Sequence, residues 1–562
     1  MPDHKKLRCV LLCNSVVFRQ WQVSCIDQMA DKAEVVLLVV NDNPSEKNGL
    51  WTKLYHYPYR NLLYRAYTRY CVHLRSQELV GMELKFNDVP VIRCKTVLKG
   101  KYSQYFSDQD IKTIKSYSPD FILRFGFNII KGDILDAAPY GVWSYHHSDE
   151  EYYRGGPPVF WEIFHGDPVS GAILQRLTGK VDAGIVLRKG YFKTILHSYR
   201  ETLDTLLSES SRWVGQVCGD LIQGNDAVFQ QQPSGSSAKM NKYPGNRQTV
   251  LFLLRLSAHK IWFHFSDLFM AESWKTGIAE APVEKILSDG FPGTIHWMQS
   301  DDRECYYADP FVFETGGKVH ILFENYSYRH AKAKISEVVL NEEYNFKISN
   351  GVFPGKFHRS YPFVIQVLGD IYCLPECCEG GSAVLYRYDN KASQWVEVAV
   401  VVNEPLVDPS MFYYHGKWWL FCTKKGQYTN MNLFIYHADD ITGPYTSHTG
   451  NPVKTDIRSS RSAGNIFEVN GKIYRPSQDC SETYGGKIRL NEITVLSETE
   501  FREKQAAIIT SPDRQFRKGI HTLSSVNGIT VFDTKRYFFS FSNFKRKLFT
   551  KMRISLFNTG LE

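Results

Sequence analysis

A repeat in the second half of the chain is the feature that most constrains its fold. Five segments each consist of an entry residue, a short apolar strand, a turn with a glycine eight residues after the entry, and a second strand rich in aromatic residues. A period near fifty residues built from antiparallel strands predicts the blades of a propeller, and five blades fit this length. The entries, separated by 52, 47, 55 and 57 residues, are Asp309, Tyr361, Asp408, Ala463 and Ile520, and the turn glycines are Gly317, Gly369, Gly416, Gly471 and Gly528.

The first half of the chain has a different texture. Apolar strand-like runs (LRCVLLCN, AEVVLLVVN, DFILRFGFN and GVWSYHH) alternate with longer helical stretches such as Ser107–Tyr117 and Glu201–Ile222. This alternation is typical of a parallel sheet with crossover helices. The first half therefore predicts a Rossmann-like α/β domain.

The segment FQQQPSGSSAKMNKYPGNRQ separates the two textures. Its Gln, Ser, Gly and Pro content predicts a linker, and the apolar run after it predicts a helix docked on one domain. We therefore expect a multidomain chain of 562 residues with an α/β domain at 1–228, a linker and docking helix at 229–285, and an all-β five-bladed propeller at 286–562.

Composition excludes several classes of protein. The net charge of +8 is weak for this length, and no zinc-finger or RNA-binding signature is present, so we expect no nucleic-acid partner. The twelve cysteines lack the paired short spacings of a zinc site, which predicts no metal and reduced thiols in a cytoplasmic protein. No run approaches the length of a membrane span. The basic, aromatic C-terminal run RYFFSFSNFKRKLFTKMRISLF leaves two interpretations open, a peripheral membrane contact or an ordinary closing strand and helix.

The stretch GVWSYHHSDEEYYRGGPPVFWEIFHG, residues 141–166, carries the most chemistry in the first half. Together with the following strand and the motif VDAG, it resembles the core of the folate-dependent formyltransferases. That family shows Asn-x-His, then a loop ending in Tyr-Arg-Gly, then a Gly-rich strand and Asp-x-Gly. The resemblance spans roughly residues 7–220 and implies an α/β formyltransferase domain that uses 10-formyltetrahydrofolate.

The resemblance also implies roles for particular residues. His146 would shuttle the amine proton, Asp182 would orient its ring and favour the imidazolium, and His147 would be a bystander. Ser144 stands where the family has asparagine, so a hydroxyl would replace an amide at the developing oxyanion. Arg154 would stabilise its loop or meet a substrate anion. The folate pocket would be lined by Ile129, Ile130, Lys131 and the segment around Asp182.

The loop before Tyr-Arg-Gly departs from the family. Asp149, Glu150 and Glu151 replace its Leu-Leu-Pro. We expect these acidic groups near the substrate entrance, where they would favour a cationic amine over an anionic substrate.

The repeats resemble a second family. The elements ADPF, SYPF, VDP, WWLF, RSAG, RPSQD and GIHT are similar to the five-bladed glycoside hydrolases that act on furanosides and pentosides. They are more similar to the propeller of plant glucosamine inositolphosphorylceramide transferases. The resemblance implies that carboxylates of different blades meet in one polar funnel, with at least one of them protonated or paired with Arg461. The candidate carboxylates are Asp309, Glu376 and Asp408, and the candidate sugar-binding residues are Arg461, Gln478, Asp479 and His521.

Together the two halves predict an enzyme that N-formylates an amino sugar, free or on a nucleotide or lipid carrier, with the propeller binding the glycan. Whether the propeller also hydrolyses glycosidic bonds stays open. The alternative is a carbohydrate-processing or glycan-binding propeller joined to a degenerate formyltransferase domain.

Overall fold

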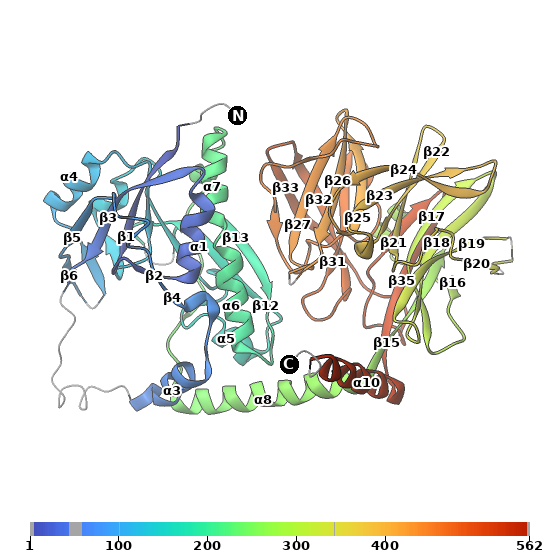
Figure 1. The fold of residues 1–562 in the computed structure, drawn as a ribbon, viewed down its shortest axis with the longest axis horizontal. Coiled ribbons are helices and arrows are strands. Elements are labelled where there is room, and N and C mark those ends of the chain that lie inside the picture. Colours follow the sequence, from blue (N-terminus) through green and yellow to red (C-terminus); the bar gives the residue numbers. More distant parts are fainter. Residues whose placement is uncertain are drawn as a thin grey trace. The chain divides into compact units, whose positions relative to one another are not determined.

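The computed structural model describes residues 5–43, 59–100, 102–180, 183–341, 343–344, 346–426 and 428–558. The chain forms two compact units, Met1–Ile261 and Trp262–Glu562 (Figure 1). The division falls inside the predicted 229–285 segment.

A seven-stranded sheet forms the centre of the N-terminal unit, in the order β13-β12-β10-β8-β1-β3-β5. The five strands from β10 to β5 are parallel, as the alternation predicts, whereas β12 runs antiparallel to both β10 and β13. The sheet is therefore mixed, and its antiparallel edge was not expected. The strands are β1 (Leu7–Cys13), β3 (Ala33–Asn41), β5 (Val91–Cys94), β8 (Phe121–Arg124), β10 (Val142–His146), β12 (Val169–Arg176) and β13 (Ile185–Lys193).

Helices cover both faces of this sheet. Successive strand residues point to opposite faces, and on β1 Val10 lies in the core with Ile114 of α4 while Cys9 lies near Cys218 of α7. The predicted helix at Ser107–Tyr117 is confirmed as α4, whose N-cap Ser107 accepts a hydrogen bond from the Asp110 backbone at 3.1 Å. The single helix expected at Glu201–Ile222 is two helices, α6 and α7. The helices are α1 (Gln20–Met29), α3 (Leu62–Cys71), α4 (Asp108–Ser116), α5 (Phe160–His165), α6 (Tyr199–Ser210) and α7 (Trp213–Ile222).

Short strands complete this unit. Among the described residues they form three small sheets, one of which joins the Tyr-Arg-Gly loop to the predicted linker. The strands are β2 (Val17–Arg19) with β4 (Leu79–Gly81), β6 (Val97–Lys99) with β7 (Ser103–Tyr105) and β9 (Ile129–Lys131), and β11 (Arg154–Gly155) with β14 (Met240–Asn241).

Helix α8 (Asn246–Phe269) follows the predicted linker and crosses the boundary between the units. Its N-terminal half belongs to the first unit, where buried Phe252 stacks on Phe160 of α5 with ring centroids 4.3 Å apart. The first half of α8 thus helps to close the aromatic core of the N-terminal unit.

Five antiparallel sheets form the C-terminal unit, which confirms the five-bladed propeller. The inner strands β17, β21 and β25 are successive neighbours, and β34 contacts β17 and closes the ring. The sheets are β17 (Cys305–Thr315), β18 (Lys318–Ser327), β19 (Lys332–Val339), β20 (Ile348–Asn350); β21 (Ser360–Val367), β22 (Asp370–Glu376), β23 (Ala383–Asp389), β24 (Gln394–Val402); β25 (Leu406–Tyr414), β26 (Lys417–Lys424), β27 (Asn432–Ala438), β28 (Thr446–Ser447), with β29 (Lys454–Thr455) on β27; β30 (Phe467–Val469), β31 (Lys472–Asp479), β32 (Lys487–Leu496), β33 (Phe501–Ile509); and β34 (Leu523–Val526), β35 (Ile529–Phe539), β15 (Met270–Ala279), β16 (Ile295–Met298).

The last sheet is built from both ends of the unit. Strand β15, which lies within the predicted 229–285 segment, pairs with β35 from Met270 opposite Phe539 to Ala279 opposite Thr530. The fifth sequence repeat therefore supplies only the inner two strands of its blade, and residues before the first repeat supply the outer two. Helix α9 (Val283–Asp289) lies between β15 and β16, and α10 (Phe541–Asn558) follows β35.

The five predicted turns have the conformation that their glycines suggest. Each glycine has a positive φ, and so does the residue before it, which is the pattern of a type I′ hairpin turn. The pairs are Gly316–Gly317, Leu368–Gly369, His415–Gly416, Asn470–Gly471 and Asn527–Gly528.

Candidate functional site

Strand β10 brings Ser144 and His146 to one face of the N-terminal sheet. The two residues are separated by one position, so their side chains point the same way. Ser144 lies between Arg124 of β8 and Gln175 of β12 in the register, and His146 lies opposite Ile173. Ser144 and His146 therefore lie at the carboxyl end of β10, next to the end of the parallel strand β8.

Arg124 is the residue in this region that sequence reasoning missed. Its Nε and Nη2 donate to the Ser144 hydroxyl oxygen at 3.1 and 3.0 Å, and its Nη1 donates to the carbonyls of Phe127 and Asn128 at 3.2 and 2.9 Å. Burial lowers the pKa of this guanidinium from its ordinary value. A cation thus lies where the hydroxyl was expected to act alone. The signal in the sequence was a single charged residue at the end of the apolar strand FILR.

His147 lies on the other face of the sheet. Its ring stacks on Tyr145, with an interplanar angle of 8°, and meets Trp21 of α1 edge-on at 4.9 Å. Burial, with a smaller contribution from His146, lowers the pKa of His147 to about 3, so the ring is neutral at ordinary pH. Its place in this aromatic packing fits the expectation that it is a bystander.

Two of the three residues of the acidic loop are buried rather than open to solvent. Asp149 and Glu150 are buried, and Lys189 of β13 binds them at 3.0 and 3.1 Å. The backbone of β12 permits this packing because a side chain at Gly171 would meet the Cβ of Asp149 at 2.7 Å. Glu151, the third acidic residue, is exposed and lies 3.3 Å from the same lysine. Lys189 therefore offsets part of the negative charge, and of the three carboxylates only Glu151 is exposed, where it can still favour a cationic amine.

Arg154 and the predicted linker are joined. Nη1 of Arg154 donates to the carbonyls of Ser236 and Ala238 at 3.4 Å each, and β11 pairs with β14 of the linker. Gly155 is required here because a Cβ would lie 2.2 Å from the Asn241 carbonyl oxygen. Of the two roles expected for Arg154, the structure provides contacts for stabilising the loop.

The residues expected to line the folate pocket lie on β9. Ile130 is buried in the core, whereas the Ile129 side chain is exposed and Lys131 is half-buried. An exposed aliphatic group beside a cation suits a flat aromatic ring system with an anionic tail, which Ile129 and Lys131 offer, whereas Ile130 packs in the core and was wrongly expected to line a pocket. Asp182 lies outside the described residues, and its pairing with His146 stays a prediction.

In the propeller, three blade entries share an unusual backbone. Asp309, Tyr361 and Asp408 have φ values of 49°, 43° and 45°, and the register of the two innermost strands shifts at each of them. A bulge of this kind re-aims a side chain, and a left-handed non-glycine residue costs about 1–3 kcal/mol. The repeated strain places the entry side chains at the centre of the ring.

The structure brings six predicted residues together; we call Asp309, Glu376, Asp408, Arg461, Gln478 and His521 the central cluster. In its first half, Asp408 accepts hydrogen bonds from Arg461 Nε at 2.5 Å, Arg461 Nη2 at 3.2 Å and Gln478 Nε2 at 2.6 Å. The Asp408 backbone donates to Glu376 at 3.2 Å, and Arg461 lies 4.0 Å from Glu376. Residues of three blades thus meet in one charged network. Asp479, by contrast, pairs with Arg489 at 2.8 Å.

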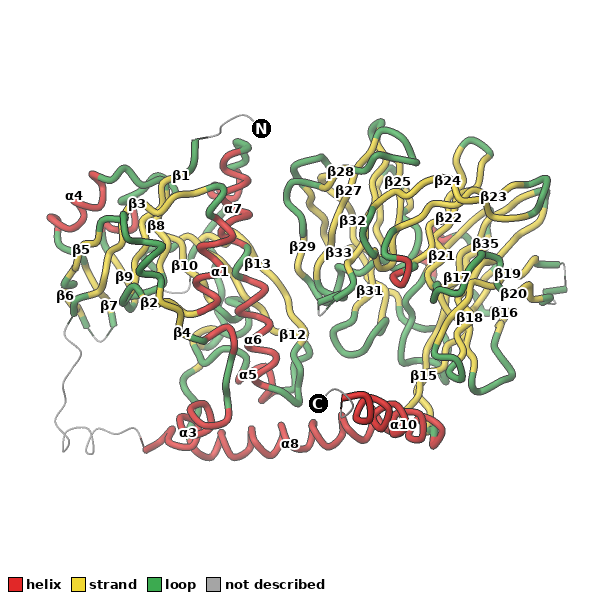
Figure 2. Tube along the Cα trace, viewed as in Figure 1, coloured by secondary structure: helices red, strands yellow, loops and turns green. Residues whose placement is uncertain are grey.

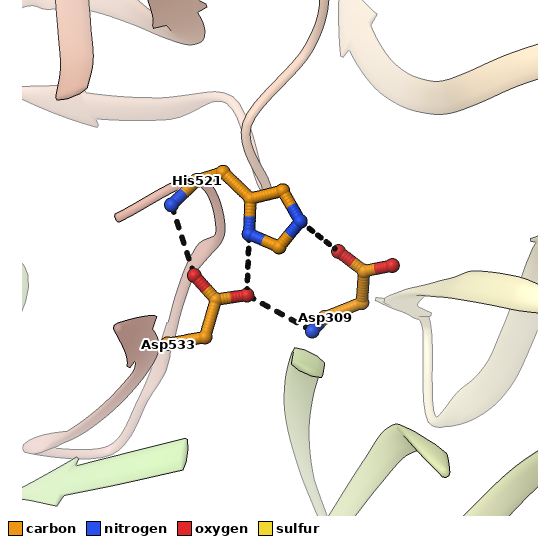
Figure 3. Close-up of side chains that lie close together, drawn as sticks. All are labelled: Asp309, His521 and Asp533. Carbon is orange, nitrogen blue, oxygen red and sulfur yellow. Dashed lines mark hydrogen bonds and ion pairs between the residues drawn. The ribbon is translucent and has the colours of Figure 1, made fainter. Parts of the chain in front are cut away.

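In the second half of the cluster, His521 lies between two carboxylates (Figure 3). Its Nε2 is 3.2 Å from Asp309 and its Nδ1 is 2.6 Å from Asp533. These three residues offer donor atoms within 4.8 Å of one another, a spacing that a metal ion could bridge. Because both ring nitrogens face carboxylate oxygens, the arrangement also suits an imidazolium, and the pKa values favour that form.

Electrostatics separate the groups of the cluster into charged and neutral forms. Burial opposes charge on His521, but Asp533 and Asp309 raise its pKa above the ordinary value. Burial and then Asp408 raise the pKa of Glu376, despite Arg461. Burial raises the pKa of Asp309, and His521 partly offsets the shift. In the central cluster, the raised pKa of Glu376 favours its protonated form, and Asp408 forms an ion pair with Arg461. The sequence predicted either a protonated carboxyl group or a carboxylate paired with Arg461, and the cluster contains both.

Sequence reasoning missed several polar residues around the centre. The position fifteen residues after each entry is occupied by Glu324, Glu376, Thr423, Gln478 and Lys535, and only two of these five were singled out. Burial, and then neighbouring carboxylates, raise the pKa of Glu324 far above its ordinary value. A polar residue at one place in every repeat was the signal that could have identified Glu324 and Lys535.

An α/β formyltransferase-like unit and a five-bladed propeller thus define this chain, and comparisons with known proteins agree. Residues 295–527 match the family model described as glucosamine inositolphosphorylceramide transferase 1, N-terminal. Glucosamine inositolphosphorylceramide transferase 1 of Oryza sativa subsp. japonica is 32% identical over 204 residues, 35% of this chain and 27% of that protein. Methionyl-tRNA formyltransferase of Borrelia duttonii (strain Ly) is 33% identical over 160 residues, 27% of this chain and 50% of that protein.

Among solved structures, an exo-β-1,3-galactanase of Clostridium thermocellum aligns with a TM-score of 0.32 and 14% identity, over 39% of this chain and 56% of that chain. The chain spans about a quarter to half of the length of the curated relatives named above. By its relatives, the chain is formyltransferase-like in its first half and similar in its second half to the N-terminal part of a glycolipid-related transferase.

Proposed function

We propose that the N-terminal unit transfers a formyl group from 10-formyltetrahydrofolate to the amine of an amino sugar, and that the propeller binds the glycan. The observation that carries this proposal is the grouping of His146, Ser144 and Arg124 at the carboxyl end of β8 and β10. Similarity to a methionyl-tRNA formyltransferase supports formyl transfer, and similarity to a glucosamine transferase supports an amino-sugar acceptor.

The chemistry assigns one task to each of these residues. The co-substrate, when bound near Ile129 and Lys131, supplies an activated formyl group. His146 takes the proton that the amine loses as the new carbon–nitrogen bond forms, and returns a proton to the nitrogen that leaves. Arg124, held by Ser144, provides the positive charge for the formyl oxygen as that oxygen becomes negative. Ser144 then acts as a positioning residue, because its oxygen accepts both guanidinium hydrogen bonds.

The propeller provides groups that suit a sugar. Hydroxyl groups both donate and accept hydrogen bonds, and the central cluster offers the ionised Asp408–Arg461 pair next to the proton-retaining Glu376. The half-buried phenol of Tyr484 meets the ring of His521 at 5.3 Å, whereas the indole of Trp274 is buried and stacks on that ring at 4.0 Å. Aromatic faces next to charged groups are common partners of sugar rings.

The proposal is tested by incubating the full chain with 10-formyltetrahydrofolate and a panel of free, nucleotide-linked and lipid-linked amino sugars, with mass detection of a formylated product. We expect product with at least one acceptor and its loss in His146→Ala. His147→Phe serves as the matched control because it alters the neighbouring ring on the other face of the sheet. Equal turnover in His146→Ala and the unchanged chain would refute the assigned role.

Arg124 and Ser144 are tested in the same assay. Arg124→Gln should lower kcat about 100-fold, the usual effect of losing one oxyanion donor. Ser144→Asn should keep or raise the rate if the amide takes over that task. A Ser144→Asn variant with no turnover and intact folding would show instead that the site depends on the Arg124–Ser144 contact.

A second candidate function is favoured by the central cluster. A proton-retaining Glu376 and an Asp309 of a different blade are the kinds of group that an acid–base hydrolysis of glycosides needs. In that case the first unit would be a degenerate formyltransferase fold. Release of reducing sugar from a glycoside panel by the full chain, lost in Glu376→Gln, together with no formyl transfer, would favour this function over the first.

A further inference from the structure

The two helices at the ends of the C-terminal unit form a compact structure outside the propeller sheets. They are residues Trp262–Phe269 of α8 and residues Phe541–Phe549 of α10, and we call them the terminal helix pair (Figure 2). Phe269 stacks on Phe544 with centroids 5.1 Å apart. Nδ2 of Asn543 donates to the carbonyls of Asp267, Leu268 and Met270 at 3.1–3.2 Å and so fixes the end of α8.

The terminal helix pair exposes an unusual amount of apolar side-chain surface. Seven large apolar residues on these two segments and on the adjoining end of β35 are between 40% and 65% exposed. An exposed apolar group of this density is uncommon on a soluble surface and generally marks a binding site. The residues are Trp262, Phe263, Phe265, Phe539, Phe541, Leu548 and Phe549.

Positive charge accompanies this apolar surface. The sequence of α10 contains five Lys or Arg residues and no Asp or Glu. Two of them are tied to the unit, since Arg546 binds Glu304 at 2.5 Å and Lys547 binds Asp267. Lys545 is exposed, and its ammonium lies 5.5 Å from the Phe541 ring. Aromatic side chains interleaved with basic ones are complementary to the headgroup region of an anionic membrane.

None of the helices within the described residues is long and apolar enough to cross a membrane. A helix with exposed aromatic residues, basic residues and modest overall hydrophobicity lies in the interface plane instead. We propose that the terminal helix pair docks the protein on an anionic lipid bilayer, with its six exposed apolar side chains and Phe539 of β35 entering the headgroup and acyl boundary.

The physical terms favour a lipid occupant. A basic residue near an anionic bilayer adds electrostatic attraction to what the aromatic groups supply, and the exposed ammonium of Lys545 can do so. A second copy of the chain would place one positive helix against another, and the electrostatic attraction to anionic lipid would be lost. The binding should therefore depend on anionic lipid and weaken with salt.

The test is flotation of the full chain with vesicles of phosphatidylcholine alone or with one-third phosphatidylserine. We expect binding to the phosphatidylserine vesicles at moderate ionic strength and at least tenfold weaker binding to the others. Trp262→Glu with Phe549→Glu should abolish flotation, and Lys545→Glu should weaken it and flatten its salt dependence. The matched control is Leu368→Glu, which places the same charge on a fully exposed apolar residue of a propeller turn.

Each other outcome overturns the proposal. Flotation unchanged by the double substitution would show that lipid binds elsewhere, and no flotation of the unchanged chain would remove the membrane as occupant. A dimer seen by light scattering and lost in the double variant would show that a second copy covers this surface. Circular dichroism and the melting midpoint of each variant separate these outcomes from unfolding, and none of them depends on formyl transfer.

Discussion

Substituting Arg461 with methionine should destabilise the propeller more than any surface change. Asp408 is 2% exposed, and the fork of Arg461 supplies two of its three side-chain hydrogen bonds from protein donors. Burial alone would lower the pKa of this guanidinium, but Asp408, Tyr484 and Glu376 raise it well above its ordinary value, so the residue is a stable cation. Its removal leaves a buried carboxylate without a counter-charge.

The magnitude follows from this geometry. Breaking a buried ion pair from one side costs about 3–5 kcal/mol, because the remaining charge is uncompensated. The double variant Arg461→Met with Asp408→Asn removes both charges and should recover most of that loss. The two variants together separate the cost of an unpaired charge from the cost of lost packing.

Hydrogen exchange measured by mass spectrometry is the suitable assay because the chain has two units and a single melting curve would mix them. Peptides of β25 and β31 should lose about 3–5 kcal/mol of protection in Arg461→Met, while peptides of β1 and β10 should be unchanged. A loss below about 1 kcal/mol would match an exposed ion pair and refute the reasoning. A double variant no better than the single one would refute it equally.

Three further predictions concern the N-terminal unit. Phe252→Ala should cost about 3–5 kcal/mol of unfolding free energy in chemical denaturation, since the buried ring that stacks on Phe160 leaves a cavity. Burial raises the pKa of Glu162 to about 7, so the native state binds its proton more tightly than the unfolded state. Stability should therefore fall between about pH 4.5 and pH 7, by on the order of 3 kcal/mol, and Glu162→Gln should abolish that slope in urea titrations. His147→Phe should keep formyl transfer within about threefold, measured beside His146→Ala, because a neutral buried ring is replaced by an apolar one of similar shape.

The repeat allowed much of the propeller to be predicted from sequence. A turn that needs positive φ leaves a glycine at a fixed place in each repeat, and the regular spacing of Gly317 and its equivalents identifies the blades. The partner of β35 could not be predicted in this way. Strand β15 lies outside the repeats, and its assignment depends on a contact across more than two hundred residues.

The candidate sites were predictable in part. His146 and the entry residues Asp309 and Asp408 stand in recognisable motifs, so their positions could be read from the sequence. Arg124 could not, because its role depends on the neighbouring strand of a parallel sheet, twenty residues away. The burial of Asp149 and Glu150 could not be predicted for the same reason, since Lys189, which binds both, lies on an edge strand that reaches them only in the folded unit.

The pairing of β15 with β35 also bears on how the protein is made. During synthesis, residues up to 261 leave the ribosome before any of the propeller, so the first unit can complete its own contacts early. The ring cannot close until the strand Ile529–Phe539 has been translated, and until then β15 exposes an unpaired edge. Nascent chains should therefore need protection by chaperones through most of the second half of translation. Premature stop codons before residue 529 should yield a folded first unit attached to an open, aggregation-prone ring.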